Sequence, residues 1–240
     1  MHGRRESKST SWISFSGIDG AGKSTQIQSL YARLKEERVD VLLLTFWDDI
    51  ATFRRTRETA AQMLFRGDKG VGTPCIPIER RDKNMRSWFM TWVRLWLYFL
   101  DAAVLRIVAS EAMHADAVVV IFDRYIYDEL ANLTLHGRAM RAYAAFIMKL
   151  APKPHLSFLL DADPAQARAR KPEYPLEFLR GNRLSYLTLS DLAGGMTIIH
   201  STTISDVERE VLRHTMGVIS IDDRSNKGKL DSSYSRPAAS

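Results

Sequence analysis

The 240-residue sequence predicts an α/β fold, a five-stranded parallel sheet with helices on both faces. Three observations lead to this prediction. Short apolar segments have the length of strands, and amphipathic segments with helical spacing separate them. Apolar residues make up 45% of the chain, which is enough to fill a core between the layers. Strands joined by helical crossovers are expected to run parallel.

Strands and helices are expected to alternate from the start. Residues 12–16 alternate apolar and polar side chains like a short strand, and residues 26–37 place apolar side chains at helical spacing. Residues 39–46 form a continuous apolar run, which is typical of a buried parallel strand. A helix over 52–65 and a loop over 67–77, which is rich in glycine and proline, are expected next.

The alternation continues through the rest of the chain. Residues 85–112 predict one or two long helices, and residues 127–150 a largely helical segment with a break near Gly137. Asp163 is expected to cap a short helix that has Pro164 at its first position. The remaining expected elements are strands at 117–122, 155–160 and 196–200 and a helix at 176–192.

The last helix and the tail are predicted from local composition. Ser205 and Glu208 have the spacing of a capping box, so a helix is expected to begin there and run to about Met216. Residues 222–240 are rich in serine, glycine and charge, and they are expected to be disordered.

Composition narrows the functional classes. The net charge of +6 is dispersed without a long basic block, so nucleic acid is not expected as a partner. Cys75 is the single cysteine, which excludes an internal disulfide and favours a reducing cytoplasm. Residues 88–108 are apolar, but they include Arg94, Asp101 and Arg106. Charges are expensive inside a membrane, so a buried amphipathic helix is expected and no membrane partner.

The most informative stretch is residues 17–25, GIDGAGKST, which fits the pattern G-x-x-x-x-G-K-[ST] between a predicted strand and a predicted helix. Glycines there let backbone amides turn toward phosphate oxygens. Lys23 is expected to reach the β- and γ-phosphates, and the Ser24 hydroxyl to bind Mg²⁺. The sequence therefore predicts a nucleoside triphosphate site. Its candidate residues are Gly17, Gly20, Ala21, Gly22, Lys23, Ser24 and Thr25.

A second motif, Asp123-Arg124-Tyr125, follows the predicted strand 117–122. Charged residues directly after a buried strand lie at the carboxyl edge of the sheet, where α/β proteins bind ligands. Asp123 is a candidate for the magnesium shell, and Arg124 for bidentate contact with a phosphate. The alternative is an ion pair that only ends the strand.

Together these motifs resemble the thymidylate kinase family of P-loop nucleoside monophosphate kinases. Residues 15–26, with an aspartate between the first two glycines and a glutamine after the threonine, are similar to the family's opening motif. Asp123-Arg124-Tyr125 is similar to its Asp-Arg-Tyr segment, and residues 159–164 to its fourth strand and following turn. The likeness spans roughly residues 11–217. The expected division is a flexible N-terminus (1–10), a P-loop kinase domain (11–220) with a lid near 168–180, and a disordered tail (221–240).

The resemblance implies an ATP- and Mg²⁺-dependent transfer of the γ-phosphoryl group to dTMP, giving dTDP for dTTP biosynthesis. It also implies a homodimer through the long helices. By position, Asp19 faces the acceptor and Arg124 contacts the acceptor's phosphate. Ala21 leaves the P-loop without an arginine, so a lid arginine, Arg168, Arg170 or Arg180, is implied to close over the transferring group. The implied catalytic residues are Lys23, Arg124, Asp19 and Arg168. The implied acceptor-binding residues are Asp19, Asp101, Arg106, Asp123, Arg124 and Tyr125, and the implied metal ligands are Ser24 and Asp123.

The sequence departs from the family pattern in three places. Residues 45–49, TFWDD, replace an Arg-Glu-Pro-Gly-Gly or Arg-Phe-Pro segment. On the long helix, Asp101 matches the family's acidic position, but Ala102 stands where the phosphate-gripping arginine belongs. Arg106, one turn later, is the candidate replacement; the alternative is an ordinary surface arginine. The lid around residues 171–175 is short and lacks the family's Asp-Arg-x-Glu cluster.

Two other functions stay open at this point. One is a P-loop kinase for another acceptor, a deoxynucleoside or small metabolite, because an uncharged acceptor needs no arginine at position 102. The other is a nucleotide-binding module without catalysis. Trp88, Trp92, Trp96 and Phe99 recur at helical spacing and are expected to form a core face, with one ring stacked on a base as the alternative.

Overall fold

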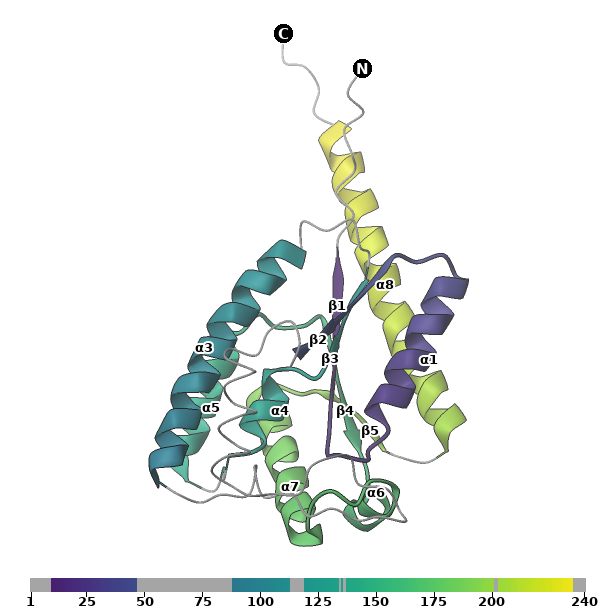
Figure 1. Ribbon diagram of the computed structural model, residues 1–240. Coiled ribbons are helices and arrows are strands. Elements are labelled where there is room, and N and C mark those ends of the chain that lie inside the picture. The colour runs from purple at the N-terminus through teal and green to yellow at the C-terminus, as the bar shows by residue number, and fades with distance from the viewer. Residues whose placement is uncertain are drawn as a thin grey trace.

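The computed structural model describes residues 10–46, 88–112, 119–133, 135, 137–200 and 203–234. Its centre is a five-stranded sheet with the order β2-β3-β1-β4-β5, in which every neighbouring pair is parallel. Helices α1 and α8 cover one face, and α3, α4, α5 and α7 lie on the other (Figure 1). The predicted α/β fold with a five-stranded parallel sheet is confirmed.

The elements follow the order that the sequence predicts. They are β1 (Ser11–Ser16), α1 (Lys23–Glu36), β2 (Val41–Thr45), α3 (Trp88–Ala112), β3 (Val119–Asp123), α4 (Ile126–Leu130), α5 (Arg138–Leu150), β4 (Leu156–Asp161), α6 (Pro164–Arg170), α7 (Leu176–Leu192), β5 (Thr197–His200) and α8 (Ile204–Tyr234). The expected break near Gly137 is confirmed, since it separates α4 from α5. The expected helix at 52–65, the loop at 67–77 and Cys75 lie outside the described residues.

Three local predictions need correction. β2 was expected to be buried, but it lies at the edge of the sheet, where Leu43 is exposed, because only β3 pairs with it. The cap of α8 is Thr203, which receives a hydrogen bond from the Asp206 amide, because the helix begins two residues earlier than Ser205 predicts. α8 also continues to Tyr234, past the expected end near Met216, since no proline interrupts the sequence before that point.

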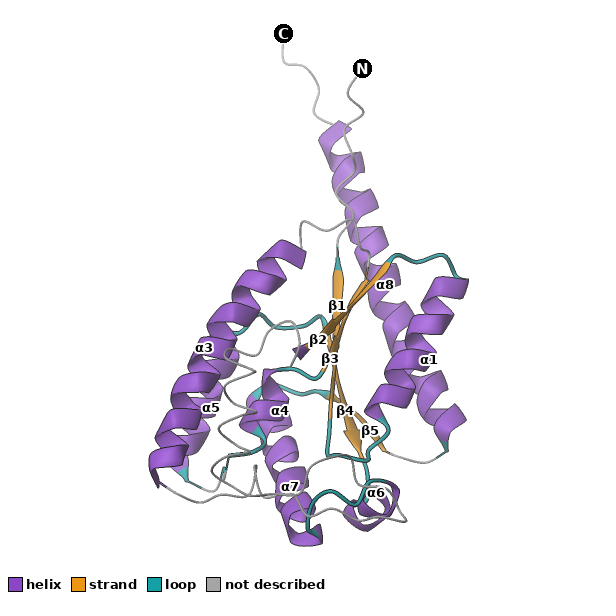
Figure 2. Ribbon diagram, viewed as in Figure 1, coloured by secondary structure: helices purple, strands orange, loops and turns teal. Residues whose placement is uncertain are grey.

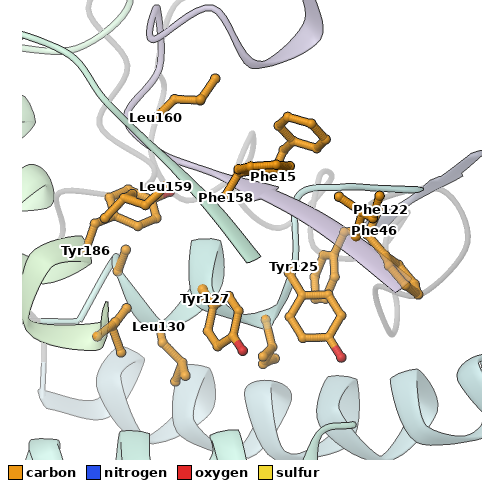
Figure 3. Close-up of a cluster of buried hydrophobic side chains, with 14 of the residues drawn as sticks. Phe15, Phe46, Phe122, Tyr125, Tyr127, Leu130, Phe158, Leu159, Leu160 and Tyr186 are labelled. Carbon is orange, nitrogen blue, oxygen red and sulfur yellow. The ribbon is translucent and has the colours of Figure 1, made fainter. Parts of the chain in front are cut away.

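The core lies on both faces of the three central strands. Toward α1 and α8, the rings of Phe15 and Phe158 lie 5.0 Å apart. On the other face, Phe122 meets Tyr125 at 5.3 Å, and Figure 3 shows these rings between the sheet and the helices. Each fully buried side chain of this size stabilises the fold by ~1.5–3 kcal/mol relative to exposure. The packing fixes the sheet rigidly behind the loops at its carboxyl edge.

The carboxyl edge of the sheet is where the chemistry-bearing loops meet. All strands end there because they are parallel, and the turn from β1 to α1 lies beside α6 at that end (Figure 2). At the opposite edge, α5 leads into the start of β4. Among the described residues, no helix has the length and hydropathy to cross a membrane, α3 included.

Candidate functional site

The turn between β1 and α1 has the conformation that its glycines permit. Gly17 and Gly20 have φ values of 144° and 85°, which residues with a side chain rarely adopt. A Cβ at Gly20 would lie 2.3 Å from the Ala167 carbonyl oxygen, and one at Gly17 2.6 Å from that of Leu160. The turn is therefore wedged between α6 and the end of β4, so its amides are held in fixed directions.

Lys23 begins α1, and its ammonium turns back over the loop. Its Nζ donates hydrogen bonds to the carbonyls of Gly17 and Ile18, the second at 3.1 Å, and the residue is only 7% exposed. Ser24 and Thr25 are exposed beside it on the first turn of the helix, which has no acidic residue. A helix N-terminus with a buried ammonium and free hydroxyls attracts polyanions. This geometry agrees with the predicted phosphate site.

Arg124 and Asp19 form an ion pair across the edge of the sheet. Arg124 Nη2 donates to Asp19 Oδ1 at 3.0 Å, and both side chains are largely shielded from solvent. Burial alone would lower the pKa of Arg124, but the carboxylates of Asp19, Asp128 and Asp123 outweigh it and raise that pKa. The second motif is thus joined to the phosphate turn by an ion pair, and the guanidinium is fully charged.

Asp123 and Tyr125, the neighbours of Arg124, point to different places. Asp123 ends β3 in register with Phe15 of β1, so its half-buried carboxylate lies close to the phosphate turn. Tyr125 is wholly buried (Figure 3), and its hydroxyl donates to the Pro152 carbonyl. The predicted acceptor contact of the Tyr125 side chain is therefore wrong, because this ring packs in the core against Phe122.

The structure also describes Asp101 and Arg106, the two α3 residues that were expected to bind the acceptor. Asp101 is completely buried, and after burial its charge is the second cause that raises the pKa of Tyr143. Arg106 donates from Nη1 to the Leu150 carbonyl at 3.3 Å. Leu150 ends α5 just before the start of β4, at the edge of the sheet opposite the phosphate turn. The structure therefore contradicts the expectation that Arg106 replaces the arginine missing at position 102.

The aromatic side chains of α3 do not form the expected core face. Trp92 and Trp96 are each 64% exposed, while Tyr98 and Leu105 lie on the buried face. Nearly the whole circumference of α3 is apolar, so spacing alone could not tell which side the sheet covers. Trp96 stacks on Phe99 with centroids 5.7 Å apart, and the side chain of Trp88 lies outside the described residues.

The lid segment joins α6 to α7 and contains the candidate arginines. Arg168 Nε donates to the Tyr174 carbonyl at 3.2 Å, which fixes it across the lid. Arg170 and Arg180 are engaged locally, with Gln166 and Glu177. The Ala167 backbone lies against Gly20, so Arg168, the next residue of α6, begins beside the phosphate turn.

Two carboxylates at this edge have structural partners. Asp161 pairs bidentately with Arg183, with one contact at 2.7 Å, and this hydrogen bond is the main cause that lowers the pKa of Asp161. Asp163 accepts from the Gln166 amide at 2.9 Å, so the predicted helix cap is confirmed. These contacts give both carboxylates a structural role at this edge of the sheet.

One functional candidate escaped the sequence analysis. Asp128 is buried on α4, directly behind Arg124, and it accepts a hydrogen bond from Tyr186 of α7 at 2.8 Å. The spacing of Asp128 three residues after Tyr125, as in a capping box, was the available signal. Its other partners, Ser16 and Tyr186, are distant in the sequence, so the pattern alone could not name them.

Comparisons with known proteins extend this picture. The chain is 26% identical over 219 residues to a probable thymidylate kinase of Pyrococcus abyssi, covering 84% of this chain and 93% of the relative. It is 25% identical over 221 residues to that of Archaeoglobus fulgidus, covering 89% and 99%. A thymidylate kinase of Chlorobium luteolum is 69% identical over 32 residues, 13% of this chain and 15% of the relative. No family model matches the chain. The chain is thus a homologue of the thymidylate kinases over most of its length.

Proposed function

We propose that this homologue of the thymidylate kinases transfers the γ-phosphoryl group of ATP to dTMP, giving ADP and dTDP. The observation that carries the proposal is the phosphate turn at the N-terminus of α1, with the Arg124–Asp19 pair at the same edge of the sheet. The similarity to probable thymidylate kinases over most of both chains supports the same reaction.

The donor nucleotide binds at the turn. Backbone amides of the turn and the N-terminus of α1 hold the β- and γ-phosphates, and Lys23 leaves the loop carbonyls to reach them. The exposed Ser24 hydroxyl and the half-buried Asp123 carboxylate supply hard oxygen ligands, which suit Mg²⁺. When bound, that ion neutralises charge on the transferring phosphates.

The acceptor lies beside Asp19 and Arg124. The guanidinium exchanges its contact with Asp19 for the acceptor's phosphate, whose oxygen attacks the γ-phosphorus while the bond to the β-phosphate oxygen breaks. Arg168 of the lid supplies the positive charge that Ala21 cannot supply. Catalysis on this scheme is positional and electrostatic, since phosphoryl transfer needs charge neutralisation more than covalent help.

One observation favours a second acceptor class. Position 102 is a wholly buried alanine, and Arg106 lies at the far edge of the sheet, so α3 offers no arginine at the family's position. A deoxynucleoside or a small neutral metabolite would not need that contact.

ADP release with purified protein separates these functions. The panel compares dTMP with dUMP, dCMP, dGMP, AMP and thymidine under saturating ATP and Mg²⁺. Turnover of dTMP above all others is the expected result. Turnover of thymidine or another acceptor with none of dTMP contradicts the dTMP assignment, and calorimetric ATP binding without any turnover contradicts the kinase assignment altogether.

We also propose that the protein is a cytoplasmic homodimer that pairs through α3 and α5. Exposed apolar side chains gather there, because Trp96 stacks on Phe99 and Phe99 stacks on Phe146 at 6.5 Å. Together with Trp92, these rings make an apolar strip of the kind that two copies of a chain bury against each other in an oligomer. Nucleotide substrates and a single cysteine favour the cytoplasm. Sedimentation of the wild type as a dimer and of Trp96→Glu as a monomer is the expected outcome.

A further inference from the structure

We propose that Asp128 is a positioning residue, whose carboxylate holds Arg124 in place and connects the helix after the lid to the phosphate turn. This role rests on the proposed function, because it acts through the residue that contacts the acceptor. The sequence motif that contains Arg124 does not by itself suggest it.

The contacts of Asp128 use both of its oxygens. Oδ2 accepts from the Ser16 hydroxyl at 2.7 Å and from the Tyr125 amide at 3.0 Å. Oδ1 accepts from the Tyr186 hydroxyl at 2.8 Å. The residue is only 5% exposed. A carboxylate in such a place is stable because three donors replace the water it has lost.

Each of these donors belongs to a different part of the site. Ser16 ends β1 and directly precedes Gly17, the first residue of the phosphate turn. Tyr125 directly follows Arg124 and is the N-cap of α4. Tyr186 is wholly shielded on α7, beyond the lid. The carboxylate of Asp128 therefore connects the phosphate turn, the backbone beside Arg124 and α7.

The backbone of Arg124 shows why such a support is needed. Arg124 has a φ of 71°, in the left-handed region that disfavours residues with a side chain. Strain of this kind persists only where the surroundings fix the conformation, and it gathers at functional sites. The hydrogen bond from the Tyr125 amide to Asp128 fixes the peptide that follows Arg124. In this conformation the guanidinium reaches Asp19.

The charge of Asp128 acts on Arg124 as well. Its field adds to that of Asp19 in holding the guanidinium at this edge of the sheet. When Arg124 releases Asp19 to bind a phosphate, the hydrogen bonds of Asp128 stay in place. We therefore expect the loss of this carboxylate to weaken binding of the acceptor and to leave binding of ATP nearly unchanged.

Steady-state kinetics of the full chain test this role. Asp128→Asn keeps the shape and removes the charge, and Tyr186→Phe removes one hydrogen bond while the carboxylate stays. Since hydrogen bonds to a charged group are among the stronger ones, the acceptor KM is expected to rise about tenfold or more in Asp128→Asn and about threefold in Tyr186→Phe. The KM for ATP is expected to stay within about twofold in both variants.

A matched control removes a buried hydroxyl elsewhere. Tyr143 donates to the Leu95 carbonyl between α5 and α3, so Tyr143→Phe also loses one tertiary hydrogen bond. It is expected to lower the melting temperature comparably and to leave both KM values unchanged. If Asp128→Asn does not fold, the comparison of the acceptor KM in Tyr186→Phe with that in Tyr143→Phe still tests the role of Asp128.

The possible outcomes separate the two proposals. An active wild type whose variants keep the acceptor KM, or change it in step with the KM for ATP, overturns the role of Asp128 alone. A wild type that turns over no acceptor overturns the proposed function and this role with it. A selective rise in the acceptor KM, absent from the control, supports the role.

Discussion

The donor side and the acceptor side of the site are built in different ways. The donor side is one continuous segment, residues 17–25, where backbone amides and Lys23 do the work. The acceptor side joins Asp19 of that same turn to Arg124 and Asp128, which follow more than 100 residues later, and the three residues interact through their side chains. The donor side depends on local backbone angles and on the position of α6 against Gly20, and the acceptor side depends on how α4 and α7 pack behind Arg124. A change in the packing of α4 against α7 is therefore expected to disable the acceptor side before the donor side.

Lys23→Ala is expected to have the largest effect, and it tests the donor side. Removing a charge that neutralises the transition state lowers kcat by about 10²–10³-fold or more. Circular dichroism should stay unchanged, because the hydrogen bonds from the ammonium to the Gly17 and Ile18 carbonyls lie within its own turn. Lys35→Ala, in the last turn of the same helix, is the control and should keep full activity. An unchanged rate in Lys23→Ala with an intact fold would contradict the phosphate site.

Arg124→Ala is the matching change on the acceptor side. Loss of a charge-assisted contact lowers kcat/KM for the acceptor by about 10²-fold, while the KM for ATP changes little. Arg106→Ala is the control, because the structure places Arg106 at the opposite edge of the sheet. Equal losses in the two variants would mean that Arg106 grips the acceptor after all. Steady-state kinetics with each substrate varied in turn make this comparison.

Gly20→Ala tests how tightly the donor turn is wedged. The new methyl group would meet the Ala167 carbonyl at 2.3 Å, so the free energy of unfolding is expected to fall by about 1–3 kcal/mol. Gly181→Ala is the control within α7, where nothing described lies within 4 Å of the new group. A stabilisation of about 0.5–1 kcal/mol is expected there, because alanine favours the helix. Urea denaturation measures both, and a neutral Gly20→Ala would show that the turn can move away from α6.

Asp161→Asn is expected to have the smallest effect on stability, and the size of that effect depends on pH. Arg183 lowers the pKa of Asp161 in the folded state, so the stabilisation is present above the ordinary carboxyl pKa near 4. It is lost as the pH falls through the lowered value. Because Arg183 is partly exposed, we expect a difference of about 1 kcal/mol at pH 7 and a smaller one at pH 3. Urea denaturation of both proteins at the two pH values tests this, and a difference that does not shrink between pH 7 and pH 3 would contradict it.

Much of the fold was predictable because its signals are local. The helix at 176–192 and the cap at Asp163 depend on periodicity and on contacts three residues apart, and the structure confirms both. The exposed face of α3 was not predictable, because an all-round apolar helix has no preferred side until its neighbours are placed. Asp128 and Arg106 show the same limit within the site. Their partners Tyr186 and Leu150 are 58 and 44 residues away, a separation that no sequence motif spans.

The contact between Ala167 and Gly20 links the lid to the phosphate turn. No atom beyond hydrogen fits at position 20 while the carbonyl of residue 167 stays where it is. A lengthened or redesigned lid can therefore vary freely only downstream of α6, since any displacement of that helix alters the space above the turn. Engineering of acceptor choice should accordingly begin after Arg170, where new loops can be grafted without remodelling the nucleotide cradle.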